Sequence, residues 1–492
     1  MRISILSLNQ IGAIMRLNSK TTISTKPLNS SKEQHSNKGI RYILSHMHRL
    51  RALMRHKDFA TLVATFTILA FGIYIFSVFS TDYSFYQKHY LNSGWLTIIS
   101  IFGVSLLSVK LLYFLYMGYN FLNYKSIASV EDQQLPKCTV IVPAYNEGKQ
   151  VYDTLVSIVN SNYPKNKIEI ISIDDGSTDD TWQWIKRAQE DLGLAISIHQ
   201  QVKNMGKRHG LYHGFKNGSG DVFVTIDSDS IIEEDTLRNL VSPFAHDPNC
   251  GAVAGNIKVL NTKKGVLPKM LDVSFVLSFE FARSAESHLK SVMCTPGALA
   301  AYKSISVYAC LEDWMHQTFM GEPSDIGEDR ALTNMILKQG QHVLFQKNAV
   351  AYTNVPETYQ GLYKMFIRWG RSNVRENLEM AKYVFSDFRP HGKTGPRLLL
   401  LSQLLHMVFS YPLVILMLFF VLTHPLLFLS GSLLSILVIS SFSVLFYAHR
   451  YKVSEGIWAY TYSLLYTFGL FWITPYAIAT ASRRGWVTRG LS

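Results

Sequence analysis

The sequence has few charged residues and few cysteines for its length. Charged residues make up 17% of the 492 residues and hydrophobic residues 48%, whereas about a quarter of a soluble protein is charged. The four cysteines contain no CxxC pair and all lie between two groups of apolar segments; they are Cys138, Cys250, Cys294 and Cys310. This usage is not that of a disulfide-stabilised domain, so we expect reduced thiols in a cytosolic domain.

The positive net charge is concentrated at the N-terminus. Residues 1–57 hold eleven Lys and Arg and one acid, which gives +10 of the total of +13 and leaves +3 for the rest of the chain. A remainder of +3 is too small to line a DNA or RNA groove, so we predict no nucleic-acid partner. Basic residues directly before an apolar segment indicate the cytosolic side and can contact anionic lipid. Because residues 1–57 are also rich in Ser, Asn and Thr, we expect them to form a disordered cytosolic arm without a signal peptide.

Five long apolar segments account for much of the hydrophobic content. They are residues 60–80, 96–119, 398–421, 425–447 and 457–480. The first has no charge over its length, and about 20 helical residues match a bilayer core of about 30 Å. A buried core helix can imitate one such segment, but five in two groups indicate a membrane protein.

The apolar segments divide the chain into four parts. These are a basic cytosolic arm (1–57), two transmembrane helices (58–119), a cytosolic domain (120–397) and transmembrane or interfacial helices with a basic tail (398–492). If all three C-terminal segments crossed the membrane, the basic tail would lie outside, against the positive-inside bias. We therefore expect residues 457–480, which contain Pro475, to be re-entrant or interfacial.

Strand and helix signals alternate in the cytosolic domain. Residues 138–143, 168–173 and 221–226 are short apolar, β-branched runs, and residues 150–160 and 179–192 have helical spacing. This alternation predicts an α/β fold with a mostly parallel sheet. Ligands of such sheets bind at the carboxyl ends of the strands, and carboxylates follow two of the predicted strands.

Two acidic motifs follow predicted strands. Asp174 and Asp175 come after IEIISI; a carboxylate there can accept hydrogen bonds from a base or ribose, although a helix-capping turn explains the motif equally well. Asp227 and Asp229 come after DVFVTI. Residues i and i+2 of a strand face the same way, so these two carboxylates can converge on Mn²⁺ or Mg²⁺ that also holds a diphosphate. A chance DxD in a surface loop is the alternative.

Two further motifs precede the second group of apolar segments. Glu328 and Asp329 open a helical run, where a carboxylate can cap the helix or act as a general base. The helix that contains Arg368, Trp369 and Arg371 can offer arginines to lipid phosphates or to a leaving diphosphate, with the indole as a stacking platform for a sugar ring. Lys207 and Arg208 are a second candidate pair for phosphate contact.

These motifs, in this order, resemble the processive family-2 glycosyltransferases. The likeness is carried by DDGS, GKR, DSD, GEDR and RW, by FEFARSAES and by the tail GWVTRG, and it is nearest to hyaluronan synthases and rhizobial chitooligosaccharide synthases. It covers residues 135–380 best. It implies a GT-A nucleotide-sugar-binding domain inserted between transmembrane segments, and a metal-dependent inverting transfer from UDP-sugar donors to a growing polysaccharide at the cytosolic face of the cell membrane.

The resemblance also implies a role for each matching residue. Asp175, Asp227, Lys207, Arg208 and Arg371 would bind the donor, and Asp229 with Asp227 would hold Mn²⁺ or Mg²⁺. Asp329 would be the base and Arg368 would hold the diphosphate. Trp369, Glu328 and Cys294 would lie at the acceptor.

Two positions depart from the family pattern. Met365 stands where the family's QxxRW motif has Gln, and Met cannot donate a hydrogen bond to a phosphate. Cys294 begins CTPG, where relatives tend to have Gly before Pro. Both leave glycosyl transfer in place and weaken the case for one particular polymer.

Three functions remain to be separated. The first is a processive polymerase that also exports its product, using UDP-GlcNAc with or without UDP-glucuronate. The second is a transferase with a short product, of chitooligosaccharide type, or a glucosyltransferase that resembles cellulose synthases. The third is a channel or sensor with a degenerate transferase domain; it predicts broken carboxylates, whereas those of the four motifs are intact.

Overall fold

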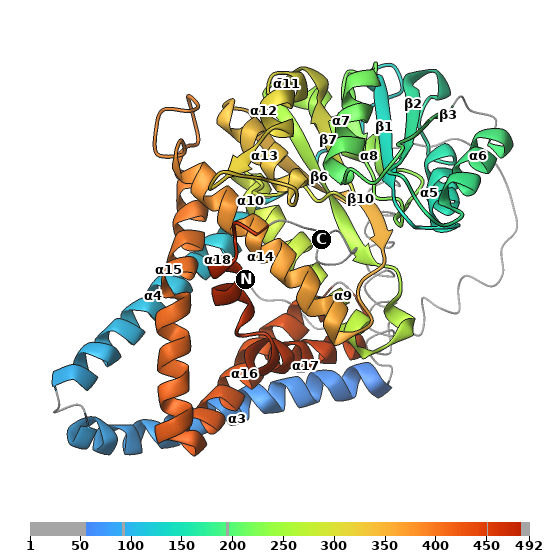
Figure 1. Ribbon diagram of the computed structural model, residues 1–492. Coiled ribbons are helices and arrows are strands. Elements are labelled where there is room, and N and C mark those ends of the chain that lie inside the picture. The colour runs from blue at the N-terminus through green and yellow to red at the C-terminus, as the bar shows by residue number, and fades with distance from the viewer. Residues whose placement is uncertain (1–55, 91–93, 193–195, 450, 484–492) are drawn as a thin grey trace, which may run out of the picture. The chain divides into compact units, whose positions relative to one another are not determined.

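The computed structural model describes residues 56–90, 94–192, 196–449 and 451–483 (Figure 1). The predictions for the basic arm and for the tail GWVTRG therefore lie outside the described residues, apart from the last two residues of the arm. The described chain contains a sheet domain and two groups of long apolar helices, one on each side of that domain in the sequence.

The sheet domain is built on eight strands in the order β3-β2-β1-β4-β7-β6-β10-β5. The strands are β1 (Cys138–Ala144), β2 (Ile168–Asp174), β3 (Ile196–Gln200), β4 (Val222–Thr225), β5 (Ile231–Ile232), β6 (Cys250–Val259), β7 (Ala300–Lys303) and β10 (His342–Thr353). Strands β3, β2, β1 and β4 are parallel, as the alternating pattern predicts. Strand β7 is antiparallel to both neighbours, so the second half of the sheet is mixed. A separate two-stranded sheet pairs β8 (Thr318–Phe319) with β9 (Glu322–Pro323).

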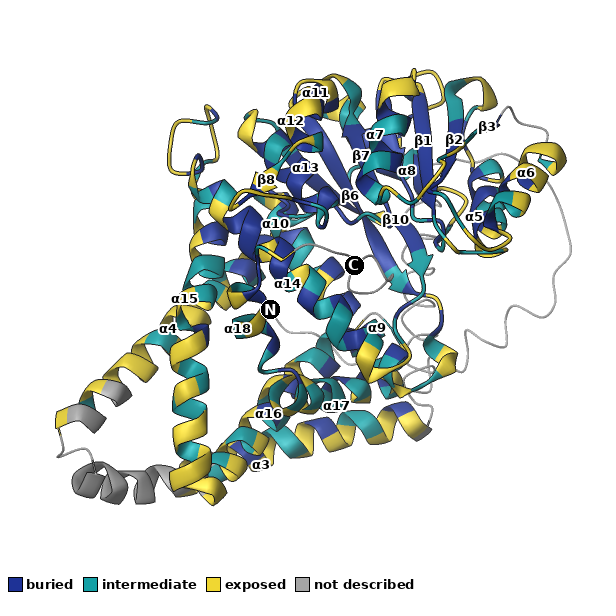
Figure 2. Cartoon of the chain, in the orientation of Figure 1, coloured by how far each residue is buried: buried dark blue, intermediate teal, exposed yellow. Residues whose placement is uncertain are grey.

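Helices cover both faces of this sheet. Helix α7 packs against β1 and β2, α8 against β6 and β10, and α13 against β6 and β10. The helices of the domain are α5 (Gln150–Val159), α6 (Thr181–Asp191), α7 (Lys207–Asn217), α8 (Thr236–His246), α9 (Val266–Phe275), the π-helix η4 (Val276–Arg283), α10 (Ser284–His288), α11 (Ser304–Tyr308), α12 (Leu311–Met315), α13 (Glu328–Lys338) and α14 (Tyr359–Ala381). The central strands β1, β4, β6 and β7 are almost wholly buried (Figure 2), whereas the edge strand β3 is partly exposed.

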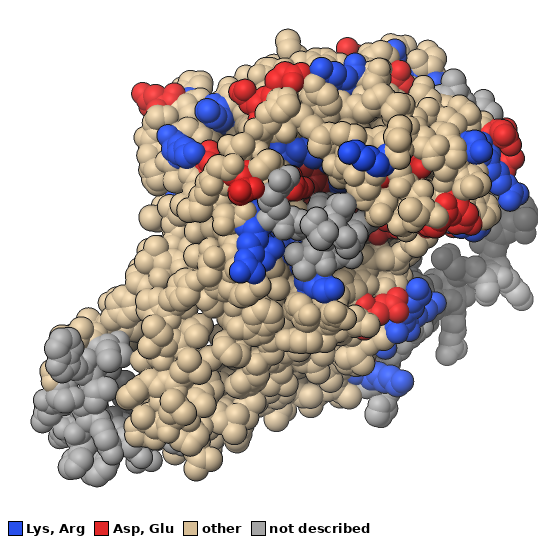
Figure 3. Space-filling view, viewed as in Figure 1, with Lys and Arg blue, Asp and Glu red and all other residues tan. Residues whose placement is uncertain are grey.

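The long apolar helices are α3 (His56–Tyr90), α4 (Gly94–Asn123), α15 (Thr394–Thr423) and α16 (Pro425–Ala448). Each contains one segment long and apolar enough to cross a membrane. Their side chains are largely exposed, and on the face shown in Figure 3 charged side chains gather over the sheet domain and are rare over these helices. Exposed apolar surface of this extent is typical of lipid-facing helices.

Two details of the membrane region bear on the sequence predictions. Residues 457–480 form two short helices, α17 (Trp458–Leu464) and α18 (Ile473–Ala479), joined by the π-helix η6 (Leu465–Gly469). The segment is therefore not one continuous helix, and its re-entrant or interfacial placement stays a prediction. Helix α3 runs past residue 80, where the predicted apolar segment ends, and continues to Tyr90. That stretch contains no Gly or Pro to end the helix.

Candidate active site

A cavity of 920 Å³ lies where the sheet domain meets the C-terminal helices. Its lining begins at the carboxyl ends of β1, β2 and β4, continues across the N-terminus of α13 and one face of α14, and ends on α15, η6 and α18. The predicted residues that line it are Asp175, Lys207, Asp227, Asp229, Cys294, Glu328, Asp329, Arg368 and Trp369. Motifs spread over almost two hundred residues of sequence thus meet in one space. For Asp175, Asp227 and Asp229 this follows from their positions after parallel strands, whose carboxyl ends meet at one edge of the sheet.

Asp175 fixes the loop that enters α7. Its two carboxylate oxygens accept hydrogen bonds from the backbone N–H groups of Met205 and Gly206, each at 2.8 Å. Gly206 has φ +94°, a backbone conformation that favours glycine. The carboxylate also borders the cavity, so the strand β2 end and the loop before Lys207 are held together at the site.

Lys207 lies between two carboxylates. Its Nζ forms an ion pair with Asp227 and a second one with Glu328 Oε1 at 3.4 Å. Burial alone would lower the pKa of Lys207, but the charges of Asp227 and Glu328 outweigh it and raise the pKa above its ordinary value. The ammonium therefore stays charged and ties the DSD motif to the GEDR motif.

Asp229 is held by hydroxyl groups. Its Oδ1 accepts from Thr353 Oγ1 at 3.2 Å, and Ser230 Oγ lies 3.4 Å from the same oxygen. Asp227 and Asp229 both line the cavity. Among the described residues no group of three or more His, Cys, Asp and Glu side chains could hold a metal ion by itself, so an ion at these two carboxylates would need oxygen ligands from a bound substrate.

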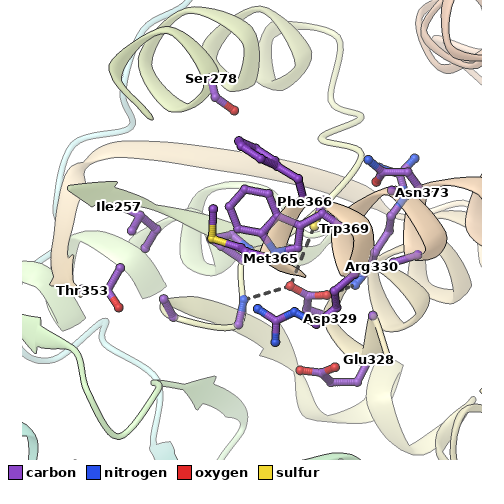
Figure 4. Close-up of a pocket in the computed structure, with 18 of the residues that line it drawn as sticks. Ile257, Ser278, Glu328, Asp329, Arg330, Thr353, Met365, Phe366, Trp369 and Asn373 are labelled. Atoms are coloured by element: carbon purple, nitrogen blue, oxygen red, sulfur yellow. Dashed lines mark hydrogen bonds between the residues drawn. The ribbon is translucent and has the colours of Figure 1, made fainter. Parts of the chain in front are cut away.

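Asp329 lies in the first turn of α13 and faces the cavity (Figure 4). Its Oδ1 accepts a hydrogen bond from the backbone N–H of Arg330 at 2.7 Å. Its Oδ2 accepts one from the backbone N–H of Gly297 at 3.1 Å. Burial and the nearby charge of Glu328 raise the pKa of Asp329, while Lys207 and the two N–H groups oppose the rise. A buried carboxylate with a raised pKa is a good general base.

Cys294 adjoins this carboxylate. Its Sγ lies 3.9 Å from Asp329 Oδ2. Burial, together with the charge of Asp329, raises the pKa of the thiol to about 12. The side chain is therefore a neutral thiol at physiological pH, so it contributes shape and a weak S–H donor rather than a thiolate.

Helix α14 supplies an aromatic and cationic wall. Trp369 keeps 39% of its surface exposed and packs against Phe366 and Phe275, with ring centroids 5.6 Å and 6.3 Å away. Arg368 and Met365 line the same cavity. The Met at the position where the family has Gln thus belongs to the site, and an apolar thioether replaces an amide there.

Two predicted donor contacts, Arg208 and Arg371, do not line the cavity and are corrected here. Arg208 is buried, lies over the Trp314 ring at 5.0 Å and donates to the Trp314 carbonyl oxygen and to Gln317. Arg371 donates to Thr480 Oγ1 at 3.1 Å and so joins α14 to the end of α18. Side chains of successive helical residues point about 100° apart, so Lys207 can face the cavity while Arg208 packs against Trp314.

The sequence did not single out several cavity residues. Thr353, Arg283, Glu286, Asn373 and Gln403 all contribute polar atoms to the lining. Thr353 ends β10 and could have been found as another polar residue at a strand end. The others lie in helical segments, where no local pattern shows which residues face a cavity.

Comparison with known proteins agrees with this site. Residues 136–372 match the family described as "Glycosyltransferase like family 2". An N-acetylglucosaminyltransferase of Azorhizobium caulinodans is 32% identical over 271 residues, which are 53% of this chain and 67% of that protein. One from Rhizobium meliloti is 34% identical over 248 residues, or 50% and 58% of the two chains. A hyaluronan synthase of Streptococcus pyogenes is 30% identical over 294 residues, or 59% and 68%.

One solved structure shares the fold. The mannosyltransferase PcManGT of Pyrobaculum calidifontis, in complex with GDP-Man and Mn²⁺, superposes with a TM-score of 0.52 at 21% identity. The match covers 78% of this chain and 97% of that one. With the sheet order, the acidic strand ends and the sequence relatives taken together, the chain belongs to the family-2-like glycosyltransferases and has a GT-A-type catalytic domain.

Proposed function

We propose that the protein is a membrane-embedded, processive, inverting β-glycosyltransferase that polymerises UDP-sugars and exports the polysaccharide. UDP-GlcNAc is the proposed donor, with or without UDP-glucuronate, in the manner of hyaluronan synthases. The observation that carries the proposal is the extent of the cavity, which runs from the strand-end carboxylates to side chains of α15, η6 and α18. A transferase that adds one sugar to a short acceptor has less need of such a continuation into the apolar helices, whereas one that acts on a lipid acceptor would share it.

The donor end of the cavity has the groups that a nucleotide diphosphate sugar requires. Asp175 is proposed to contact the uridine, and Lys207 and Arg368 the diphosphate. Asp227 and Asp229 fit a divalent ion because both are carboxylates on one strand end that border the cavity. They would hold Mn²⁺ or Mg²⁺, and the bound ion would neutralise the negative charge of the leaving diphosphate. The mannosyltransferase of Pyrobaculum calidifontis, which shares the fold, was solved with Mn²⁺, and this supports a divalent ion in general.

At the acceptor end, Asp329 is proposed to take the proton of the attacking hydroxyl. The hydroxyl oxygen then displaces the diphosphate from the anomeric carbon, with inversion at that carbon. Gly297 N–H and Arg330 N–H fix the carboxylate for this transfer. Trp369, with Glu328 and Cys294 near it, is proposed to hold the acceptor sugar, because an exposed aromatic face binds the apolar face of a sugar ring.

The proposed orientation follows the positive charge of the arm, which places the catalytic domain on the cytosolic side of the cell membrane. The alternative is a non-processive or short-product N-acetylglucosaminyltransferase, which the likeness to the rhizobial enzymes favours. A glucosyltransferase acting on UDP-glucose is a second alternative. The same experiment tests all three.

The experiment is UDP release by the purified protein in nanodiscs with Mn²⁺ or Mg²⁺, with each UDP-sugar offered singly and in pairs. Release only with UDP-GlcNAc plus UDP-glucuronate, and a long product on a gel, would establish a hyaluronan synthase. Release with UDP-GlcNAc alone and short products would favour the chitooligosaccharide type. No release with any donor would contradict glycosyl transfer and favour a sensor.

A further inference from the structure

A group of amide side chains lies in the part of the cavity beyond the base. Arg330 follows Asp329 in α13, but its side chain turns away from that carboxylate. Its guanidinium donates to Asn373 Oδ1 at 2.8 Å, to Asn377 Oδ1 at 2.7 Å and to Gln403 Oε1 at 2.8 Å. One buried cation thus joins α13, α14 and α15. All four residues line the cavity, and Figure 4 shows Asn373 and Arg330 on the same side of Asp329.

Arg330 determines which atom of each amide faces it. Arginine has only donors, so a hydrogen bond from it must end on the amide oxygen, and the NH₂ group must point elsewhere. The NH₂ group of Asn377, which is 2% exposed, approaches Met407 Sδ at 3.4 Å. For Asn373 Nδ2 and Gln403 Nε2, no hydrogen-bond partner occurs among the described residues.

These two nitrogens are therefore available to a ligand in the cavity. Asn373 is exposed and Gln403 is half-buried although both line the cavity, so they are accessible from it. The result is a patch of fixed donors next to the base. Sugar hydroxyls can accept from these donors, but the carbonyl oxygen of an amide is a stronger acceptor, so a patch of NH₂ donors favours a group that carries one.

We propose that Asn373 and Gln403, held by Arg330, form an acceptor-sugar subsite that recognises the carbonyl oxygen of an N-acetyl group. The inference rests on the proposed function and makes its acceptor specific. It places an N-acetylamino sugar, rather than a plain hexose, beside Asp329 or one unit farther along the chain. The subsite explains how the acceptor can be selected independently of the donor.

A carboxylate is another strong acceptor, and a uronic acid carries one, whereas the ring and glycosidic oxygens of any hexose are weaker acceptors. Carboxyl groups already surround Arg330, however. Asp329 is adjacent, and Glu286 and Glu376 also lie near it. Burial raises the pKa of both carboxyl groups, and the positive charge of Arg330 is one of the influences that lower it. Another negative charge would add to this acidic environment, whereas a neutral carbonyl oxygen would not.

The subsite can be tested by isosteric substitutions. In Asn373→Asp and Gln403→Glu the side chain keeps its shape and its oxygen for Arg330, but an acceptor oxygen replaces the donor NH₂ group. The matched control is Asn377→Asp, which makes the same change at an NH₂ group that faces Met407. Binding is measured by calorimetry on the full-length protein in nanodiscs, with chitotetraose, cellotetraose and a hyaluronan tetrasaccharide that ends in glucuronate.

We expect Asn373→Asp and Gln403→Glu each to weaken chitotetraose binding about 5- to 10-fold relative to cellotetraose, the effect of one lost hydrogen bond. The control should leave this ratio unchanged. An equal loss for both oligosaccharides, or preferential binding of the glucuronate-ended ligand by the wild type, would overturn the proposal. So would a wild type that does not bind chitotetraose. Calorimetry needs no turnover, so these outcomes are distinct from a failure of UDP release, which would instead contradict the proposed function.

Discussion

The backbone N–H of Gly297 donates to Oδ2 of Asp329 at 3.1 Å and so joins the segment after Cys294 to the base at the start of α13. A Cβ atom at Gly297 would lie 2.5 Å from Lys207 Nζ. The glycine therefore permits two contacts at once, the hydrogen bond to the base and the close approach of the lysine that pairs with Asp227. One small residue thus links the segment after Cys294, the proposed base and the Lys207–Asp227 ion pair.

Replacing Asp329 by Asn removes the proposed base and keeps the shape of the side chain. We expect the turnover number to fall about 10²- to 10⁴-fold, while the affinity for UDP changes little. The measurement is UDP release together with calorimetric UDP binding. Because burial opposes the charge of Asp329, the variant should not unfold at a lower temperature than the wild type. Wild-type turnover in Asp329→Asn would contradict the assignment of the base.

The pH dependence should reflect the same carboxyl group. Its pKa is raised, first by burial and then by the charge of Glu328. Since the base must be unprotonated, turnover should fall with decreasing pH through a value above the ordinary Asp pKa of about 3.9. Lys207 opposes the rise, so Lys207→Met should move this acidic limb to higher pH. A limb that did not move would mean that another group titrates.

The metal site can be separated from the base by Asp229→Asn. Loss of one of two carboxylates should abolish the Mn²⁺-dependent part of UDP binding, because the remaining protein ligand is Asp227. Calorimetric titration of UDP with and without Mn²⁺ measures this difference directly. Asp329→Asn is the control, since it should retain the metal-dependent binding. Equal UDP affinity with and without Mn²⁺ in the wild type would exclude a metal at the two carboxylates.

Arg208 should matter for stability rather than for donor binding. Arg208→Met would remove the donor to the buried Trp314 carbonyl and to the half-buried Gln317 side chain, at a cost of about 1–3 kcal/mol. Thermal unfolding should show the loss, whereas the KM for the UDP-sugar should change less than twofold. Lys207→Met is the comparison, because it should raise the KM. A large increase in KM for a well-folded Arg208→Met would restore the arginine as a donor ligand.

Glycine at position 327 is expected to be needed for folding of the acidic motif. Its φ is +76°, and a Cβ atom there would collide with the Ser372 side chain on α14. A left-handed conformation costs a residue with a side chain about 1–2 kcal/mol before the collision is counted. Gly327→Ala should therefore lower the unfolding temperature, as measured by scanning fluorimetry in detergent. Gly321→Ala is the control, since it has a similar φ of +84° but open space around it.

Much of the fold and part of the site could be predicted from the sequence. The strands β1, β2 and β4 follow from short β-branched runs, and the polar residues at their ends converge because parallel strands end at one edge. Strand β7 could not be foreseen, because its AAYK sequence has no β-branched run and its direction depends on pairing with β4 and β6. The continuation of α3 to Tyr90 was not predicted, because residues 81–90 lie beyond the apolar segment 60–80 from which the helix was inferred.

The site was predicted less completely for a different reason. Motif residues were assigned by position in the sequence, and neighbours such as Lys207 and Arg208 were given one role. In the structure the first faces the cavity and the second lies against Trp314. The direction of a side chain on a helix depends on packing with distant segments, which a single sequence does not report. The amide side chains that bind Arg330 were missed for the same reason, because only the packing of three helices brings them together.

The arginines of α14 also have a mechanical meaning. Arg371 donates to Thr480, and Arg375 donates to the carbonyl oxygens of Ala481 and Arg483. The helix that carries Trp369 is thus fastened to the segment that follows α18. If the thickness or tension of the bilayer displaces α18, α14 must move with it or lose these hydrogen bonds. The lipid environment then acts on the position of Trp369, and membrane composition becomes an experimental handle on glycosyl transfer.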